Sequence, residues 1–213
     1  MSPNTWWHCG PHRIYCGSVD HPDVLQQLLP YLPAADLVLW DPLGGAAPAA
    51  GYELARRGRV AAVVTERHRL PALVAQVPVP YRTTLATLSL PPPAEGEPRR
   101  PEWTPVALFS PHELPEDLES VFLCEAACSQ EPPEAEAHAA LLRQQWLLEQ
   151  WTPPGGIVLA PHLGRGAALL AAEASGRVCW GAQADPRECA ALLRRWEGLT
   201  GQAAVPAPAG GSR

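Results

Sequence analysis

Short apolar runs alternate with helical segments along this chain, and that alternation restricts its fold more than any other feature. The runs over 35–40, 59–65 and 157–160 consist mainly of apolar residues, as in parallel strands that are buried on both faces. Predicted helices lie between them, and the clearest covers 135–151. We therefore expect an α/β fold, with a mostly parallel sheet and helices on both faces.

Further elements follow from shorter patterns, punctuated by Pro and Gly. The other predicted strands are 12–17, 83–90, 104–109, 121–123 and 178–182, and the other predicted helices are 22–29, 52–57, 70–76, 167–175 and 186–200. Gly176 is expected to end one helix and Asp185 to cap the next. We expect one domain over 1–201, an exposed Pro/Glu/Arg loop over 91–102 and a flexible tail over 202–213.

The charge balance bears on possible partners. The net charge is -6, and all 16 basic residues are Arg. A protein that grips duplex DNA by itself usually presents a basic face to several phosphates, so we expect DNA binding to be weak or dependent on a partner. The chain has no apolar run of roughly 18 residues and no signal-peptide pattern, so we expect a cytoplasmic protein without a membrane span.

The cysteine pattern favours reduced thiols over metal ligands. The six Cys form no CxxC pair. His8, Cys9, His12 and Cys16 lie close together in the sequence, but their spacing is not that of a zinc finger and 12–17 reads as a strand. We therefore expect no metal site.

Three strand ends are the candidate ligand positions. In open parallel sheets, ligands bind at the carboxyl ends of the strands. The rule points to the turns after Cys16, after Trp40 and after Leu159, each of which contains Gly or Pro.

These turns carry motifs in a recognisable order. The motif segments are His12–Ser18, Ala35–Gly44, Pro154–Gly166, Gly176–Arg177, Gly181–Pro186 and Arg195–Gly201. In this order they resemble the DNA amino-methyltransferases that modify the exocyclic nitrogen of adenine or cytosine. The closest resemblance is to the permuted, beta-like class, in which the catalytic half precedes the cofactor half. The resemblance covers about 12–202 and implies a Rossmann-like methyltransferase fold.

The resemblance implies a pocket for S-adenosylmethionine above Gly164 and Gly166, whose lack of a side chain allows close backbone approach. The family places three acids around that cofactor, and the matching positions here are Ala160, Gln183 and Ser18. Hydrogen bonds to a charged group are each worth roughly 1.5–3 kcal/mol. A micromolar ligand has only about 8 kcal/mol of binding free energy, so losing three such bonds is comparable to the whole affinity.

The family's catalytic motif, Asp-Pro-Pro-Tyr, is half kept. Asp41 and Pro42 match the acid and the prolyl carbonyl that accept hydrogen bonds from the target amino group. Leu43 and Gly44 replace the second Pro and the aromatic that stacks on the flipped base, and such stacking is worth roughly 1–3 kcal/mol. In the glycine loop, Arg165 adds a cation that suits an anion better than a sulfonium.

Three functions remain open at this point. The first is a degenerate, inactive methyltransferase-like protein that acts as a binding or structural subunit, with an active methyltransferase or a nucleic-acid-processing assembly as its partner. The second is an active S-adenosylmethionine-dependent DNA amino-methyltransferase with divergent motifs. The third is an anion- or nucleotide-binding protein that uses the old cofactor pocket through Arg165. Trp6 and Trp7, near the amino end, are expected to contact a partner.

Overall fold

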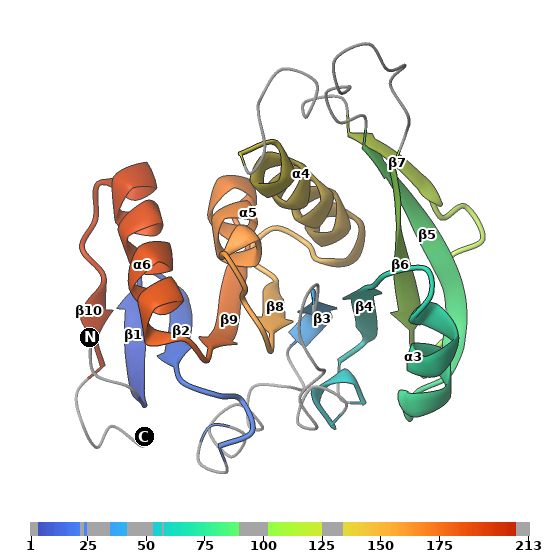
Figure 1. The fold of residues 1–213 in the computed structure, drawn as a ribbon, viewed down its shortest axis with the longest axis horizontal. Helices are drawn as coiled ribbons and strands as arrows, with labels where there is room; N and C mark the ends of the chain where they lie inside the picture. Colours follow the sequence, from blue (N-terminus) through green and yellow to red (C-terminus); the bar gives the residue numbers. More distant parts are fainter. Residues whose placement is uncertain are drawn as a thin grey trace.

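One ten-stranded sheet runs through the protein (Figure 1). The computed structural model describes residues 4–21, 24, 35–41, 53–56, 58–89, 102–124 and 134–207. The strands are β1 (Thr5–Cys9), β2 (His12–Cys16), β3 (Ala35–Trp40), β4 (Val60–Val64), β5 (Tyr81–Ser89), β6 (Glu102–Phe109), β7 (Val121–Cys124), β8 (Ile157–Ala160), β9 (Val178–Gln183) and β10 (Val205–Pro206). The helices are α3 (Leu70–Gln76), α4 (Glu134–Trp151), α5 (Ala167–Ser175) and α6 (Pro186–Thr200).

The strand order is β10-β1-β2-β9-β8-β3-β4-β6-β5-β7. Its centre, from β2 to β4, is parallel throughout, as the apolar runs predict. The flanks contain antiparallel pairs, with β10, β1 and β2 on one side and β4, β6 and β5 on the other. The α/β prediction is confirmed, and β5 and β6, which the sequence predicted as strands, form one of the antiparallel pairs.

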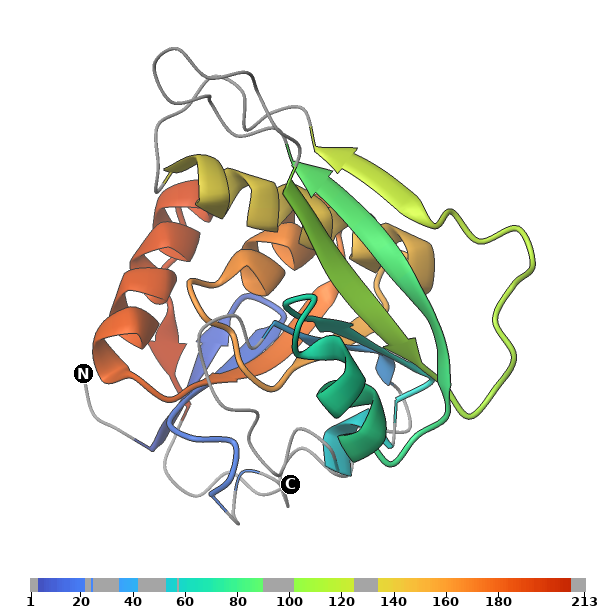
Figure 2. The ribbon, with the colours of Figure 1, turned by 45° about the vertical axis from the view of Figure 1, so that its right-hand side comes forward.

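Helices cover both faces of the sheet. On one face, α4, α5 and α6 bury side chains such as Leu147, Leu169 and Leu192 against the strands. On the other face, Leu73 of α3 and the helical residue Leu54 pack beneath the central strands (Figure 2). No helix in the described part of the chain combines the length and apolar character needed to cross a membrane.

Two predicted helix ends are confirmed at the level of individual hydrogen bonds. Gly176 ends α5 with a φ of 66°, and its N–H donates to the carbonyls of Ala172 and Glu173. The Asp185 side chain caps α6 by accepting from the Arg187 N–H at 2.7 Å. Together these caps define the turns that lead into and out of β9.

The carboxyl-terminal segment differs from its prediction. Part of the expected flexible tail forms β10, which pairs with β1 through Trp7 and Pro206, and the Ala207 N–H donates to the Trp6 carbonyl at 2.8 Å. Trp6 also packs against Tyr15, with ring centroids 5.2 Å apart. Trp6 and Trp7 are half-buried, and their expected contact with a partner stays a prediction.

Some predictions lie outside the described residues. They are the helix from Pro22 to Leu29 apart from Val24, the loop over 91–101, and the tail over 208–213. Pro42, Leu43 and Gly44 lie outside as well, so the geometry of the catalytic motif rests on Asp41. Of the predicted loop, Glu102 instead begins β6.

Candidate functional site

The candidate site lies along the edge where the central parallel strands end. Ser18 follows β2, Asp41 follows β3, and Ala160 and Gln183 are the last residues of β8 and β9. Because the paired strands run in the same direction, their carboxyl ends share one edge of the sheet. The structure therefore brings the predicted positions to one edge.

The two glycines of the loop after β8 have different surroundings. Gly166 has a φ of 89°, and a Cβ built on it would collide with Leu192 Cδ1 of α6, so only glycine fits. Gly164 has a φ of 52°, and among described residues only His162 Nδ1, at 4.0 Å, approaches a Cβ built there. Helix packing accounts for Gly166, whereas the described residues leave the Cβ side of Gly164 open.

Hydrogen bonds pin the glycine loop to the neighbouring elements. The buried Gln183 side chain donates to the Gly164 carbonyl and accepts from the Asp185 N–H at 3.0 Å. Arg195 donates to the Arg165 carbonyl at 2.6 Å. At the position where the resemblance places a ribose-binding acid, the side chain is therefore engaged in holding the loop.

The other two positions that the resemblance matches to cofactor-binding acids also have local structural roles. Ala160 is 1% exposed, and its methyl group belongs to the apolar core under α4, α5 and α6. Ser18 closes a turn, since its Oγ accepts from the Asp20 N–H at 3.2 Å and its carbonyl accepts from the His21 N–H at 3.1 Å. These two positions and Gln183 therefore all serve the fold.

Asp41 is held by α4. Its Oδ2 accepts from Arg143 Nη2 and from Gln144 Nε2, each at 3.1 Å. The ion pair is largely shielded from water, with side-chain exposures of 10% for Arg143 and 16% for Asp41. The carboxylate that sequence assigned to the target amino group thus already accepts two hydrogen bonds from its own protein.

Arg143 and Gln144 were missed by sequence reasoning. Arg143 Nε and Gln144 Oε1 are buried and have no hydrogen-bond partner, which is uncommon for buried polar atoms. In α4, Gln144, Leu147 and Leu148 are more deeply buried than the neighbouring Gln145. The sequence signal that could have indicated their burial was the spacing of Arg143 and Gln144, which lie four residues before Leu147 and Leu148 and so share a helix face with them.

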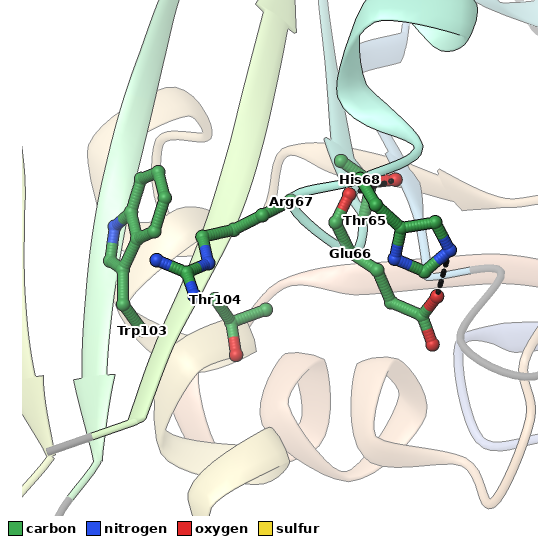
Figure 3. A pocket seen from close by; sticks show the side chains of 6 residues that line it. All are labelled: Thr65, Glu66, Arg67, His68, Trp103 and Thr104. Atoms are coloured by element: carbon green, nitrogen blue, oxygen red, sulfur yellow. Dashed lines mark hydrogen bonds and ion pairs between the residues drawn. The ribbon is translucent and has the colours of Figure 1, made fainter. Parts of the chain in front are cut away.

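A cavity of about 320 Å³ lies beyond the end of β4, the strand next to β3 (Figure 3). Its lining residues are Thr65, Glu66, Arg67, His68, Trp103 and Thr104. The Arg67 guanidinium lies 5.5 Å from the centroid of the Trp103 ring, a cation–π contact at a partly exposed aromatic. Sequence analysis did not predict this cavity, because its two walls are far apart in the chain.

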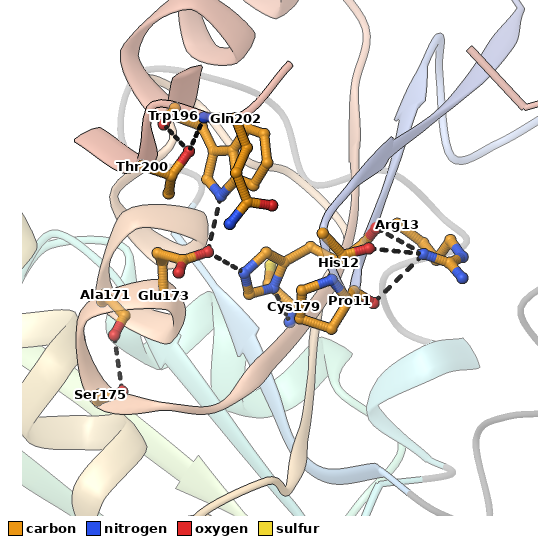
Figure 4. A network of polar contacts seen from close by, with 11 residues as sticks. Pro11, His12, Arg13, Ala171, Glu173, Ser175, Cys179, Trp196, Thr200 and Gln202 are labelled. Carbon is orange, nitrogen blue, oxygen red and sulfur yellow. Dashed lines mark hydrogen bonds and ion pairs between the residues drawn. The ribbon is translucent and has the colours of Figure 1, made fainter. Parts of the chain in front are cut away.

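A polar network joins β2 and β9 to α5 and α6 (Figure 4). His12 Nδ1 accepts from the Cys179 N–H at 2.9 Å, so Nε2 carries the proton that it donates to Glu173 at 2.9 Å. Trp196 donates to the same Glu173 oxygen at 2.8 Å. Burial lowers the pKa of His12, which keeps the imidazole neutral.

The pKa of Glu173 is shifted in the direction expected for a carboxylate that accepts these hydrogen bonds. Burial alone would raise its pKa, but the hydrogen bonds from Trp196 and His12 outweigh that effect, and the pKa lies below its ordinary value. The carboxylate is therefore ionised at neutral pH and links β2 with α5 and α6.

Two of the His and Cys residues that lie close together near the amino end, His12 and Cys9, have environments that disfavour metal binding. His12 bonds to Glu173 and Cys179, and burial raises the pKa of Cys9 to about 12. Within the described ranges, no three His, Cys, Asp or Glu side chains are grouped so as to hold a metal ion.

The arrangement of strands and helices is that of the DNA methyltransferase fold. The putative DNA modification methylase TTHA0409 from Thermus thermophilus has this fold, with a TM-score of 0.63 at 14% identity over 91% of this chain and 97% of that one. M1.HpyAVI in complex with S-adenosylmethionine gives 0.58 at 14% identity, covering 85% and 97%. The cytosine-N4-specific PvuII DNA methyltransferase gives 0.57 at 11% identity, covering 85% of each chain.

At the level of sequence, no family model and no curated protein matches the chain. Identities of 11–14% to those three structures establish a shared fold and leave the activity to the site itself.

Proposed function

We propose that this chain is a degenerate member of the permuted DNA amino-methyltransferases that no longer transfers methyl groups and acts in the cytoplasm as a binding or structural subunit. The observation that carries the proposal is the pairing of Asp41 with Arg143 and Gln144. Its partner would be an active methyltransferase or another nucleic-acid-processing assembly.

The pairing bears directly on catalysis. In the resembling family, the acid at this position accepts a hydrogen bond from the target amino group. A neutral amino group that used Asp41 Oδ2 would have to compete with a charge-assisted bond from Arg143, and such bonds are worth roughly 1.5–3 kcal/mol. The ion pair therefore disfavours the contact on which methyl transfer depends.

The cofactor side supports the same conclusion. TTHA0409 has been solved with S-adenosyl-L-methionine bound, which makes this cofactor the first ligand to test. Here the three positions that correspond to cofactor-binding acids hold a core methyl group, a turn-closing hydroxyl and the loop-pinning amide of Gln183. Each has a structural role, and none supplies a carboxylate for the cofactor.

Calorimetry with S-adenosylmethionine, and transfer of its labelled methyl group to duplex DNA, test the proposal together. We expect no binding at micromolar concentrations and no transfer above background, with an active DNA methyltransferase as the positive control. Arg143→Ala releases Asp41 from the ion pair and is expected to remain inactive, because the cofactor contacts are still missing. Micromolar binding by the unmodified protein, or transfer that disappears in Asp41→Ala, would contradict the proposal.

A second candidate function is an active DNA amino-methyltransferase, and the Arg67–Trp103 cavity is the observation that favours it. Asp41 and Thr65 follow neighbouring strands, so a partly exposed indole stands on the same edge as the retained acid. Trp103 could stack on a base in place of the aromatic that Gly44 replaces. Methyl transfer lost in Trp103→Ala but kept in Tyr81→Ala, which alters another exposed aromatic, would establish this function.

A third candidate is anion binding at the glycine loop. Arg195 donates to the Arg165 carbonyl, so two guanidinium-bearing residues meet at the start of α5. A rise in melting temperature with ATP or inorganic phosphate, lost in Arg165→Gln but retained in Arg187→Gln, would support it. An unchanged melting temperature with both anions would exclude it.

A further inference from the structure

The outer part of the sheet has an apolar face on β5, β6 and β7. Three cross-strand neighbours, Leu123, Leu88 and Trp103, form one row across it, and Val121, Ala86 and Pro105 form the next. Residues directly opposite each other on neighbouring strands project from the same side of a sheet. We call the surface formed by these six residues the outer face.

The side of the sheet on which the outer face lies follows from the alternation of β7. Phe122 stacks on Trp146 of α4, with ring centroids 5.1 Å apart, and is thus on the helix-covered side. Val121 and Leu123, its neighbours in the strand, must project to the opposite side. On that side α3 covers the far end of β6 near Phe109, at a distance from Trp103 along the strand.

The outer face is unusually exposed for apolar side chains. Three of its six residues are exposed: Trp103 by 37%, Leu123 by 47% and Val121 by 50%. Leu88 and Ala86 are half-buried and Pro105 is buried, and the Arg67 guanidinium lies 5.5 Å from the centroid of the Trp103 ring. Single exposed apolar residues are ordinary, but a contiguous group on adjacent strands is typical of an interaction surface. β7 is also the last strand of the sheet, so on its outer side the part of the chain described by the structure contributes no further strand. An open strand edge beside an apolar face is suited to the addition of another strand.

Charge narrows the choice of what binds there. The segment 111–120, which leads into β7, contains Glu113, Glu116, Asp117 and Glu119 and no Lys or Arg. Glu113 pairs with Arg82 at 2.9 Å, and Glu119 accepts from Trp146 at 3.0 Å. Glu116 and Asp117 are exposed, so the approach to β7 is acidic. This polarity repels phosphates, and a second copy of the chain would bring a second acidic segment into the contact.

We propose that the outer face and the edge of β7 bind an extended segment of a protein partner, with apolar residues at alternate positions and basic residues at the end nearest 113–119. The added strand would pair with the β7 backbone, place its apolar side chains on Val121, Leu123 and Trp103, and place its cations near Glu116 and Asp117. This inference rests on the proposed binding role and deepens it by naming the surface and the chemistry of the partner.

Fluorescence anisotropy with labelled synthetic peptides tests the proposal on the full chain. The probe is an eight-residue peptide of alternating valine and threonine with two arginines at one end, made with the arginines at either end because the strand direction is open. Matched peptides carry glutamates instead of arginines, or a central proline. We expect saturable binding of one arginine peptide, at least tenfold weaker binding of its glutamate and proline counterparts, and slower hydrogen exchange over 121–124 when the peptide is bound.

Variants locate the binding surface. Leu123→Thr is expected to weaken peptide binding at least tenfold. Threonine is β-branched and suits a strand, so β7 should still form in this variant. Glu116→Gln with Asp117→Gln should weaken binding of the arginine peptide alone. Leu199→Thr changes an exposed leucine of α6 and should leave binding unchanged. Melting temperatures and circular dichroism confirm that each variant is folded.

Three results would overturn the assignment. The first is that no peptide binds saturably at millimolar concentration. The second is that Leu123→Thr leaves peptide binding intact. The third is that the protein self-associates or binds duplex DNA and that Leu123→Thr abolishes this. None of these readouts measures methyl transfer, so failure of the docking surface and failure of the proposed loss of activity remain distinguishable.

Discussion

Two polar clusters, each centred on a carboxylate, have different hydrogen-bond environments. In the His12–Glu173–Trp196 network, each polar side-chain group that joins the three residues has a partner. In the Asp41–Arg143–Gln144 cluster, Arg143 Nε and Gln144 Oε1 are buried without one. The first cluster joins β2 and β9 to α5 and α6 (Figure 4), and the second joins the end of β3 to α4.

The difference predicts unequal contributions to stability. A satisfied network stabilises the fold because each buried donor and acceptor is compensated, whereas unpaired buried polar atoms are unfavourable. We therefore expect the first cluster to dominate stability and the second to contribute little. The following predictions test this comparison, from the largest expected effect to the smallest.

Removing the His12 side chain should produce the largest loss. His12→Ala leaves the Cys179 N–H and the Glu173 carboxylate without their partner and creates a cavity between β2 and α5. We expect the free energy of unfolding to fall by about 3–5 kcal/mol. Urea denaturation measures it, with His68→Ala, an exposed histidine, as the control. A loss similar to that of the control would show that the network is not structural.

The same histidine predicts a pH dependence. Its pKa is lowered in the folded protein, so the unfolded chain binds more protons between that pKa and the ordinary value of 6.5. Stability is therefore fully present above about pH 7 and is lost as the pH falls below 6.5 toward the folded pKa. Urea denaturation at pH 8, 7 and 6 should show this decline, with a shallower slope in His12→Ala. Equal slopes would mean that another group is responsible.

Introducing the acid that the resembling family has at position 183 should be unfavourable. Gln183→Glu places a carboxylate against the Gly164 carbonyl, where the amide now donates, and loses a hydrogen bond at a buried position. We expect a loss of about 1–3 kcal/mol of stability by thermal denaturation. Gln202→Glu, at an exposed glutamine, is the matched control. Tighter S-adenosylmethionine binding without loss of stability would show that the pocket is still adapted to the cofactor.

Replacing the second cluster should have the smallest effect. Asp41→Asn combined with Arg143→Met removes both charges and keeps similar volumes, and buried ion pairs replaced in this way are often neutral in stability. We expect a change within about 1 kcal/mol by urea denaturation. A loss as large as that of His12→Ala would remove the contrast between the two clusters.

Sequence predicted the fold better than the site. Apolar runs and caps such as Asp185 are local signals, and they placed the central strands and α6 correctly. The partners of Asp41 were missed because Arg143 lies 102 positions away, and only packing of α4 on β3 brings them together. The need for glycine at position 166 was missed for the same reason, because Leu192, with which a Cβ there would collide, lies on a different helix. Contacts between distant segments leave no pattern that a single sequence displays.

The short pairing of β10 with β1 has a topological consequence. The Ala207 N–H bonds to the Trp6 carbonyl, so the two described ends of the chain lie side by side at one margin of the sheet. A linker of a few residues could join them, and a cut in a surface loop elsewhere would then generate a differently ordered sequence with the same three-dimensional structure. In such a variant the motifs would follow one another in a different order while keeping the same spatial arrangement.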